Sequence, residues 1–433
     1  MNHHSSVGLL EHTKKQPNEK TDPRSEKRRK SDDDKTMSDQ DVFILSAART
    51  PITRFKTGQL ASAAATDLGA HCIRHVCRRA ELDAAKVQLV YAGCVYQASC
   101  APNPARIAAL NAGIPASAPC VTVNRVCSSG MSALVEARRA LMLGDAQVAI
   151  AAGFESMSNV PFYLPRELKY GGFTAEDGLS KDGLLDGIVC EQMGALAEHT
   201  ATDLNIDRKE QDDYAVRSYK AAAAAWQSGV YKREVEPFAI KTRAGETLVA
   251  DDDEHSKLNE QKMRSLPSAF KSGGTITAAN ASTLADGASA LLLATRNYCR
   301  DWKLTPIAQI LATAETARRP QEFTVAPVDA IKTVVARAGV KFTDLSRLEI
   351  NEAFSVTPLA CAKLLLMDIP QINEIINQHG GAVAMGHPLG MSGNRLCTHL
   401  ASTLQAGQIG VAAICNGGGG ATAVLIKACG TDQ

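Results

Sequence analysis

Long apolar runs, an excess of one charge and paired metal-ligand motifs are all missing from this sequence. No stretch approaches the roughly 20 apolar residues that a membrane-spanning helix needs. The 47 Lys and Arg residues are balanced by 46 Asp and Glu residues, so no basic excess indicates nucleic acid or an anionic membrane. There is no Cys-x-x-Cys pair and no His-Glu-x-x-His motif, so neither usual type of zinc site is indicated. We therefore expect neither a nucleic-acid partner nor a membrane partner.

The cysteines lack the pattern of a disulfide framework. Twelve of them are scattered through 433 residues, and no secretory signal pattern precedes them. We expect reduced thiols. A composition of 45% hydrophobic, 21% charged and 5% aromatic residues is that of a soluble protein, and the length predicts two or three domains.

The first 36 residues have the composition of a disordered tail. The basic run Lys27–Lys30 is followed almost at once by Asp32–Asp34, and apolar residues are few. The basic run could be a nuclear signal, but a solvated charge run is the favoured interpretation. A mitochondrial presequence should be amphipathic and poor in acids, whereas this tail carries Glu11 and Glu19 among its bases. We expect a cytoplasmic protein, with a mitochondrial location as the alternative.

From residue 41 onward, strand-like apolar runs alternate with helical stretches, which is typical of an α/β fold. Strands are predicted over 41–46, 87–95, 121–126, 148–152 and 410–415, and helices over 103–113, 129–143 and 391–407. The last helix and strand repeat the order of an earlier pair, which suggests a duplicated architecture. Residues 157–284 are richer in Gly, Asp, Lys and Tyr and are interpreted as a large insertion, with helices around 192–204 and 208–229.

Helix 129–143 is predicted to bury one face. Its apolar residues Met131, Leu134, Val135 and Leu141 recur at helical spacing, and Gly144 ends it.

Cys127 lies where a predicted strand ends and this helix begins, in the segment Asn124-Arg-Val-Cys-Ser-Ser-Gly130. That position puts the sulfur at the positive end of the helix dipole, beside free backbone N–H groups that favour a thiolate. The same N–H groups could form an oxyanion hole. A buried structural cysteine is the alternative interpretation.

Three further side chains could take part in acid–base chemistry. His387 lies in a glycine-rich turn, where it could accept a thiol proton or simply bond a backbone carbonyl. Cys415 ends an apolar strand before four glycines, which could instead cradle a phosphate or form a tight turn. Asn351 follows another strand pattern and could orient a water or a histidine, or cap the next helix.

Together these segments resemble the thiolases over residues 40 to 428. The matching segments are those around Cys127, Gly153–Ser158, Asn280–Ser282, Asn351–Phe354, Gly386–Gly390 and Cys415–Gly420. The resemblance implies an α/β protein with the five-layered αβαβα thiolase fold, built from two similar halves and an inserted loop domain. The expected division is a disordered tail (1–36), an N-terminal half (37–156 with 285–304), a loop domain that binds coenzyme A (157–284) and a C-terminal half (305–433).

The resemblance also implies roles in catalysis. Cys127 is expected to be the acylated nucleophile, His387 its activator and Cys415 the acid/base that forms the acetyl-CoA carbanion. His387 and a water on Asn351 would hold the enolate oxygen, and the N–H groups of Cys127 and Gly417 the tetrahedral oxyanion. The implied activity is that of an acetyl-CoA C-acetyltransferase, which condenses two acetyl-CoA to acetoacetyl-CoA and CoA. CoA thioesters are the substrates, no cofactor is covalently bound, and the family favours a homotetramer or homodimer.

Two further sets of residues follow from the resemblance. The coenzyme A contacts are expected at Leu184, Gln192, Met193, His255, Lys262, Phe270, Ala281, Ser282, Phe354 and Leu389. A potassium ion, as in the mitochondrial-type acetoacetyl-CoA thiolases, would be held by Tyr219 and by the carbonyls of Ala278, Ala279, Ala281 and Val383. The chain departs from that subgroup at Gln192, where many members have His, and at Thr324, where the subgroup has Pro.

Two other functions stay open. A degradative 3-ketoacyl-CoA thiolase for longer chains shares all three catalytic motifs and differs in pocket shape. A non-catalytic CoA- or lipid-binding relative would be expected to have lost Cys127, His387 or Cys415, and none is lost. Ketoacyl synthases pair one Cys with two His, or with His and Asn, so the retained Cys415 disfavours them.

Overall fold

The computed structural model describes residues 38–167, 170–242, 245–366 and 372–430. The described residues from 40 onward form one compact unit. The predicted tail, residues 1–36, lies outside the described residues. Within the described ranges, no helix is both long enough and apolar enough to cross a membrane.

One mixed sheet runs through the compact unit. Its strands are β1 (Val42–Arg49), β2 (Thr53–Arg54), β3 (Leu89–Gly93), β4 (Cys120–Val123), β5 (Val148–Ser156), β12 (Ala285–Thr295), β13 (Ala308–Ala317), β14 (Leu345–Ile350), β15 (Ile409–Asn416) and β16 (Gly420–Ala428). The order is β14-β15-β16-β13-β1-β12-β5-β3-β4, with β2 beside β12. The two halves of the sheet meet where β1 pairs with β13 over only two residue pairs, Phe43 with Gln309 and Ile44 with Ala308.

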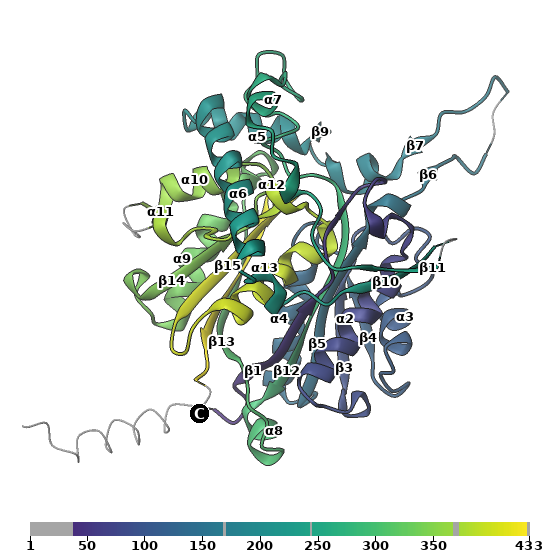
Figure 1. Cartoon of the computed structure of the whole chain (residues 1–433), viewed down its shortest axis with the longest axis vertical. Helices are drawn as coiled ribbons and strands as arrows, with labels where there is room; N and C mark the ends of the chain where they lie inside the picture. Colours follow the sequence, from purple (N-terminus) through teal and green to yellow (C-terminus); the bar gives the residue numbers. More distant parts are fainter. Residues whose placement is uncertain (1–37, 168–169, 243–244, 367–371, 431–433) are drawn as a thin grey trace, which may run out of the picture. The chain divides into compact units, whose positions relative to one another are not determined.

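Helices cover both halves and also lie between them. The helices concerned are α2 (Ala65–Arg79), α3 (Pro104–Asn111), α4 (Ser129–Leu143), α9 (Ala326–Ala338), α10 (Val356–Leu365) and α13 (Leu389–Thr403). Helices α2 and α3 pack on the β1-to-β4 half and α9 on the β13-to-β16 half, while α4 and α13 pack on each other between the halves (Figure 1). The layers follow the order αβαβα, which confirms the predicted fold.

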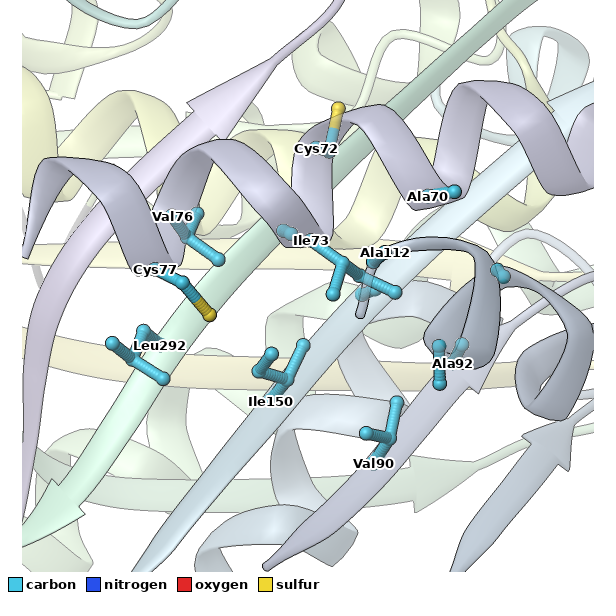
Figure 2. Close-up of a cluster of buried hydrophobic side chains, with 14 of the residues drawn as sticks. Ala70, Cys72, Ile73, Val76, Cys77, Val90, Ala92, Ala112, Ile150 and Leu292 are labelled. Carbon is cyan, nitrogen blue, oxygen red and sulfur yellow. The ribbon is translucent and has the colours of Figure 1, made fainter. Parts of the chain in front are cut away.

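The alternation of strand residues explains the layers. In β1, Phe43 and Leu45 face the core under α2, whereas Val42 and Ile44 face the core around α4 and α13. Figure 2 shows Ile73 and Cys77 of α2 above strand residues such as Ile150. Because both faces of each half are covered by helices, the strands are apolar on both sides.

Helix α4 has the predicted bounds and buries the predicted apolar residues, but its first turns are buried on every side. Every residue from Ser129 to Val135 is buried, and exposed residues such as Arg139 and Leu143, which is 80% exposed, occur only in the second half. The reason is its place in the central layer, where sheet strands and α13 surround its first turns. Small residues such as Gly130 allow this close packing, since a Cβ there would lie 2.5 Å from the carbonyl oxygen of Gly390.

Residues 157–284 contribute no strand to the main sheet among the residues that the structure describes. They form short hairpins and helices: β6 (Phe162–Tyr163), β7 (Glu176–Asp177), β8 (Leu185–Asp186), β9 (Glu191–Gln192), α5 (Met193–Asp203), α6 (Arg208–Gln227), β10 (Phe238–Thr242), β11 (Gly245–Val249) and α7 (Glu260–Ser265). The remaining short helices are α8 (Arg296–Asp301), α11 (Ile372–Ile375) and α12 (Ala382–Met385).

Candidate active site

Cys127 sits on a tight turn between β4 and α4. Val126 has a φ of +48°, a left-handed conformation that a β-branched residue rarely adopts. The hydroxyl of Ser129 stabilises the turn, accepting from the N–H of Arg125 at 2.8 Å and donating to the carbonyl of Val126 at 2.6 Å. The Arg125 side chain forms an ion pair with Glu315 of β13 in the other half. The turn that carries Cys127 is therefore fixed by the Ser129 hydroxyl within it and by the ion pair to the other half of the sheet.

The expected thiolate at Cys127 is not what the structure favours. Burial raises the pKa of this thiol to about 12, although the backbone N–H groups of Cys127 and Gly417 donate to the sulfur and oppose the shift. The desolvation penalty outweighs the helix N-terminus, so the resting thiol is neutral and needs a base when it attacks. The two N–H groups lie beside the sulfur, where they are available to donate to the oxyanion of an intermediate formed on it.

His387 lies in the turn between α12 and α13. Gly386, with a φ of +106°, precedes it, and a Cβ at that glycine would lie 2.6 Å from the Cβ of Ala285, so the turn requires glycine. The N–H of His387 donates to the carbonyl of Thr283 at 2.9 Å, and the residue is 4% exposed. The backbone thus fixes the ring, as predicted from the glycine-rich segment.

Ser392, which the sequence reasoning missed, assigns the tautomer of His387. Its hydroxyl donates to the carbonyl of Pro388 at 2.9 Å and lies 2.6 Å from His387 Nδ1, so it accepts the Nδ1 proton. Nε2 then carries the lone pair, 3.3 Å from Asn351 Nδ2. Burial lowers the pKa of His387 to about 3, with a smaller contribution from Arg395, so the imidazole is a neutral base. In the sequence, this contact could have been inferred only from the spacing, because Ser392 follows the histidine by five residues, in the first turn of α13.

Replacing Ser392 with alanine should lower kcat by about tenfold, less than the roughly 10²–10⁴-fold that a general base supplies. Without the acceptor, the imidazole is free to take the other tautomer and to rotate. Steady-state kinetics would measure the loss, and Ser392→Thr should restore most of it, because the threonine hydroxyl can accept the same proton. Equal activity of Ser392→Ala and the wild type would contradict the tautomer assignment.

Cys415 and Asn351 lie deeper than Cys127 and His387. Cys415 is 1% exposed near the end of β15, where burial and, to a smaller extent, the neighbouring Cys127 thiol raise its pKa well above the usual range. Asn351 is fully buried, and its N–H donates to Ala413 at 3.0 Å. Its Oδ1 has no hydrogen-bond partner among the described residues, so it can accept from a water or a substrate. The capping alternative is wrong, because α10 begins at Val356 with Ser355 as its N-cap.

The four glycines after Asn416 form a tight turn. Gly418 and Gly419 have φ values of +80° and +87°, and a Cβ at Gly419 would lie 2.3 Å from the carbonyl oxygen of Arg318. The N–H of Gly418 donates to Asp186 Oδ2 at 2.9 Å. The side chain of Ser128, beside the nucleophile, donates to Asn416 Oδ1 at 3.0 Å. The turn therefore joins the loop after Cys415 to the start of α4.

A cavity of about 670 Å³ opens onto Cys127 and His387. Eight of the ten predicted coenzyme A residues line it: Leu184, Gln192, Met193, Phe270, Ala281, Ser282, Phe354 and Leu389. The segment carrying Ala281 is held by Phe354, with which it forms a β-bridge, and the Ser282 hydroxyl donates to Ala353 at 2.9 Å. Lining residues that sequence reasoning missed include Arg54, Phe55, Lys56 and Thr283.

His255 and Lys262 are not among the residues that line this cavity. The His255 ring stacks on Trp226 of α6, with ring centroids 5.8 Å apart and planes 15° apart. Lys262 is exposed on α7. Their predicted contacts with the nucleotide part of coenzyme A stay predictions.

The expected potassium ligands lie in three segments. Tyr219, Val383 and Ala279 belong to one apolar cluster, and the Tyr219 hydroxyl donates to Glu254 Oε1 at 2.8 Å. Within the described residues, no backbone hydrogen bond outside helices and strands accepts at the carbonyls of Ala278 or Ala279. Free carbonyl oxygens beside a carboxylate fit a hard cation in donor type.

Glu155 is a second residue that the sequence reasoning missed. It is fully buried at the end of β5 and accepts from the N–H groups of Val95, Tyr96 and Gly390 at 3.0, 3.1 and 2.8 Å. Burial raises its pKa to about 7, and the three backbone donors oppose the shift. The carboxylate therefore links β5 to the loop after β3 and to the start of α13, next to His387.

A neutral thiol and a neutral imidazole on one cavity, with two backbone donors at the sulfur, fit covalent cysteine catalysis on an α/β fold. Residues 42–297 match the family model "Thiolase, N-terminal domain", and residues 304–428 match "Thiolase, C-terminal domain". The chain belongs to the thiolase family.

Relatives and solved structures agree with this assignment. The acetyl-CoA acetyltransferase, mitochondrial, of Rattus norvegicus is 46% identical over 390 residues, 89% of this chain and 91% of the relative. The structure of the Acat5 thiolase from Ascaris suum in complex with coenzyme A is 42% identical with a TM-score of 0.85, covering 90% of this chain and 100% of that one. Human mitochondrial 3-ketoacyl-CoA thiolase is 33% identical with a TM-score of 0.86, covering 91% and 100%.

Proposed function

We propose that this thiolase is an acetyl-CoA C-acetyltransferase. The observation that carries the proposal is that Cys127 and His387 line one cavity. The buried Cys415 lies close enough to Cys127 for that thiol to contribute to its raised pKa. Identity of 46% to the rat acetyl-CoA acetyltransferase supports this activity over that of a longer-chain thiolase, for which the identity to the human structure is 33%.

In the first half-reaction Cys127 attacks the thioester carbonyl of acetyl-CoA, and its proton moves to His387 Nε2. The N–H groups of Cys127 and Gly417 stabilise the oxyanion. The C–S bond to CoA breaks, and the leaving CoA thiolate takes the proton of Cys415. The products are acetyl-Cys127, an imidazolium at His387 and a thiolate at Cys415, with free CoA released.

In the second half-reaction the Cys415 thiolate takes an α-proton from a second acetyl-CoA. Its neutral resting state, indicated by the raised pKa, suits this role because the thiolate exists only after acylation. The carbanion attacks the carbonyl of acetyl-Cys127, with His387 and a water on Asn351 holding the enolate oxygen. The C–S bond to Cys127 breaks, and the Cys127 thiolate takes the proton back from His387.

Chain-length selectivity tests the proposal. In the degradative direction, kcat/KM for acetoacetyl-CoA should exceed that for 3-ketoacyl-CoAs of six or more acyl carbons by about tenfold or more, the scale on which a pocket discriminates methylene groups. Phe323 and Phe354, whose ring centroids lie 6.4 Å apart, form an apolar part of the cavity wall. Higher kcat/KM for the longer substrates would favour the degradative 3-ketoacyl-CoA thiolase instead.

Potassium is part of the proposal, with Tyr219 and the carbonyls of Ala278, Ala279, Ala281 and Val383 as its ligands. A cation there would order the segment that carries Ser282 and couple it to the His387 turn through Val383. Replacing sodium by potassium at constant ionic strength should raise the rate with acetoacetyl-CoA, and Tyr219→Phe should reduce the response. Identical rates in the two salts would remove the site.

The division into domains is also proposed: residues 157–284 form the loop domain, between an N-terminal half (37–156 with 285–304) and a C-terminal half (305–433). The absence of main-sheet strands among the described residues of 157–284 supports it. Apart from cuts in the predicted tail, trypsin digestion under native conditions should first cut inside 157–284, and early cleavage inside the main sheet would argue against the division.

We propose a homodimer or homotetramer. Strand β4 lies at the edge of the sheet, and its Val121 is 43% exposed, which suits pairing with a second copy. Sedimentation of the full chain would measure the mass, and a monomer would refute the proposal.

The expected cytoplasmic location gains no support from the relatives, since the rat protein is named mitochondrial. We therefore propose the mitochondrial alternative. Fractionation of cells that express the tagged full chain would test it, and recovery in the cytosol would contradict it.

A further inference from the structure

Two cysteines outside the catalytic set share one small space in the loop after β3. The Cys100 thiol donates to the carbonyl of Tyr96 at 3.4 Å, and the Cys94 sulfur lies 3.9 Å from the same oxygen. Both sulfurs therefore lie within 4 Å of one carbonyl oxygen. Neither sulfur is needed for the reaction proposed above.

The two thiols differ in exposure. Cys94 is fully buried, whereas Cys100 is partly exposed and lines a second cavity of about 450 Å³ with Tyr96 and Ser99. The neighbouring Cys94 thiol lowers the pKa of Cys100, while the pKa of Cys94 itself is raised well above the usual range. A small oxidant can therefore reach the more acidic thiol, and the less acidic one lies directly behind it.

The backbone of the loop keeps the pair together. Ser99, Ala101 and Asn103 all have positive φ values, of 64°, 59° and 52°, which non-glycine residues adopt only when their surroundings hold them there. The Gln97 side chain donates to the carbonyl of Cys94 at 3.1 Å. The loop therefore has a defined backbone conformation, in which both sulfurs face the Tyr96 carbonyl oxygen.

We propose that Cys94 and Cys100 form a peroxide-responsive dithiol beside the active site. Hydrogen peroxide oxidises the Cys100 thiolate to a sulfenic acid, and the peroxide O–O bond breaks to release hydroxide. The Cys94 sulfur then attacks the Cys100 sulfur, the S–O bond breaks, and water leaves with the Cys94 proton. The product is a disulfide, which a dithiol such as dithiothreitol reduces again.

The disulfide would reach the catalytic histidine through Glu155. The Cys94 sulfur lies 3.7 Å from Glu155 Oε1, and Oε2 of the same carboxylate accepts from the N–H of Gly390 at the start of α13. In the oxidised form Cys94 has no proton to donate to this carboxylate. We expect kcat to fall by about fivefold, the equivalent of one lost hydrogen bond. This effect on rate rests on the proposed function, whereas disulfide formation does not.

The bond can be measured directly on the full chain. Trypsin releases both cysteines in one peptide, Val87–Arg106. After hydrogen peroxide treatment and alkylation of the remaining thiols, this peptide should be lighter than its reduced, unalkylated mass by two hydrogen atoms. Cys100→Ser should prevent this loss of mass. The control is Cys120→Ser, which removes another partly exposed thiol from the next tryptic peptide, and in this variant the Val87–Arg106 peptide should still lose two hydrogen atoms. Melting curves of both variants would show that they are folded.

Two results would overturn the proposal. One is a doubly alkylated Val87–Arg106 peptide at peroxide doses that oxidise the exposed Cys190. The other is a dithiothreitol-reversible loss of rate that is the same in Cys100→Ser as in the wild type, because the loss would then come from other thiols. An enzyme inactive when fully reduced would refute the proposed function and leave the peptide measurement interpretable.

Discussion

Replacing Cys127 with alanine should lower the thiolase rate by at least about 10⁴-fold, because no other group can carry the acyl intermediate. The sulfur is the only one among the described cysteines that lines the main cavity, and it meets the two N–H groups that would hold the oxyanion. Removing it takes away the covalent step rather than a supporting contact. Mass spectrometry of the intact chain after mixing with acetyl-CoA should show one acetyl group on the wild type and none on the variant.

The control is Cys120→Ala, which removes a partly exposed thiol from β4, seven residues earlier. Its rate should stay within about twofold of the wild type, as expected for a side chain away from the reacting atoms. An acetylated Cys127→Ala protein, or a residual rate above a tenth of the wild type, would mean that another residue is the nucleophile.

Much of the site could be predicted because its residues stand at ends of elements. Cys127 lies where an apolar strand gives way to a helix, and α4 begins and ends at the predicted residues. His387 follows a glycine that only a turn would require, and Cys415 ends a strand that apolar residues define. Local patterns of this kind predict where an element begins and ends. That the segments of Cys127, His387 and Cys415 meet in one site was predicted only from the family resemblance.

What could not be predicted depends on contacts between distant segments. Ser392 bonds His387 Nδ1, and Glu155 bonds the N–H of Gly390 three residues further on, and no spacing rule anticipates either contact. The pKa of Cys127 is a further case, because the helix dipole is visible in the sequence but the desolvation that outweighs it is not. His255 and Lys262 were assigned by position in the chain, and packing places them outside the cavity lining.

Replacing Cys415 with alanine should separate the two half-reactions. The acetyl group should still transfer to Cys127, because His387 can return its proton to the leaving CoA. Formation of acetoacetyl-CoA should fall by roughly 10²–10⁴-fold, the share of a general base, because no thiolate remains to take the α-proton. A rapid-quench experiment should show a burst of CoA equal to the enzyme concentration, followed by almost no turnover. The wild type should also exchange the methyl protons of acetyl-CoA with deuterated water, and the variant should not.

The matched control is Cys397→Ala, which removes an equally buried thiol from α13. Both changes leave a cavity of similar size, so both should lower the melting temperature to a similar extent. Only Cys415→Ala should block exchange and condensation. If the burst were lost together with the condensation in Cys415→Ala, Cys415 would be required to protonate the leaving CoA, and the expectation that His387 can return its proton instead would be wrong. If Cys397→Ala lost condensation to the same degree, the effect would come from packing around the central layer rather than from a base at residue 415.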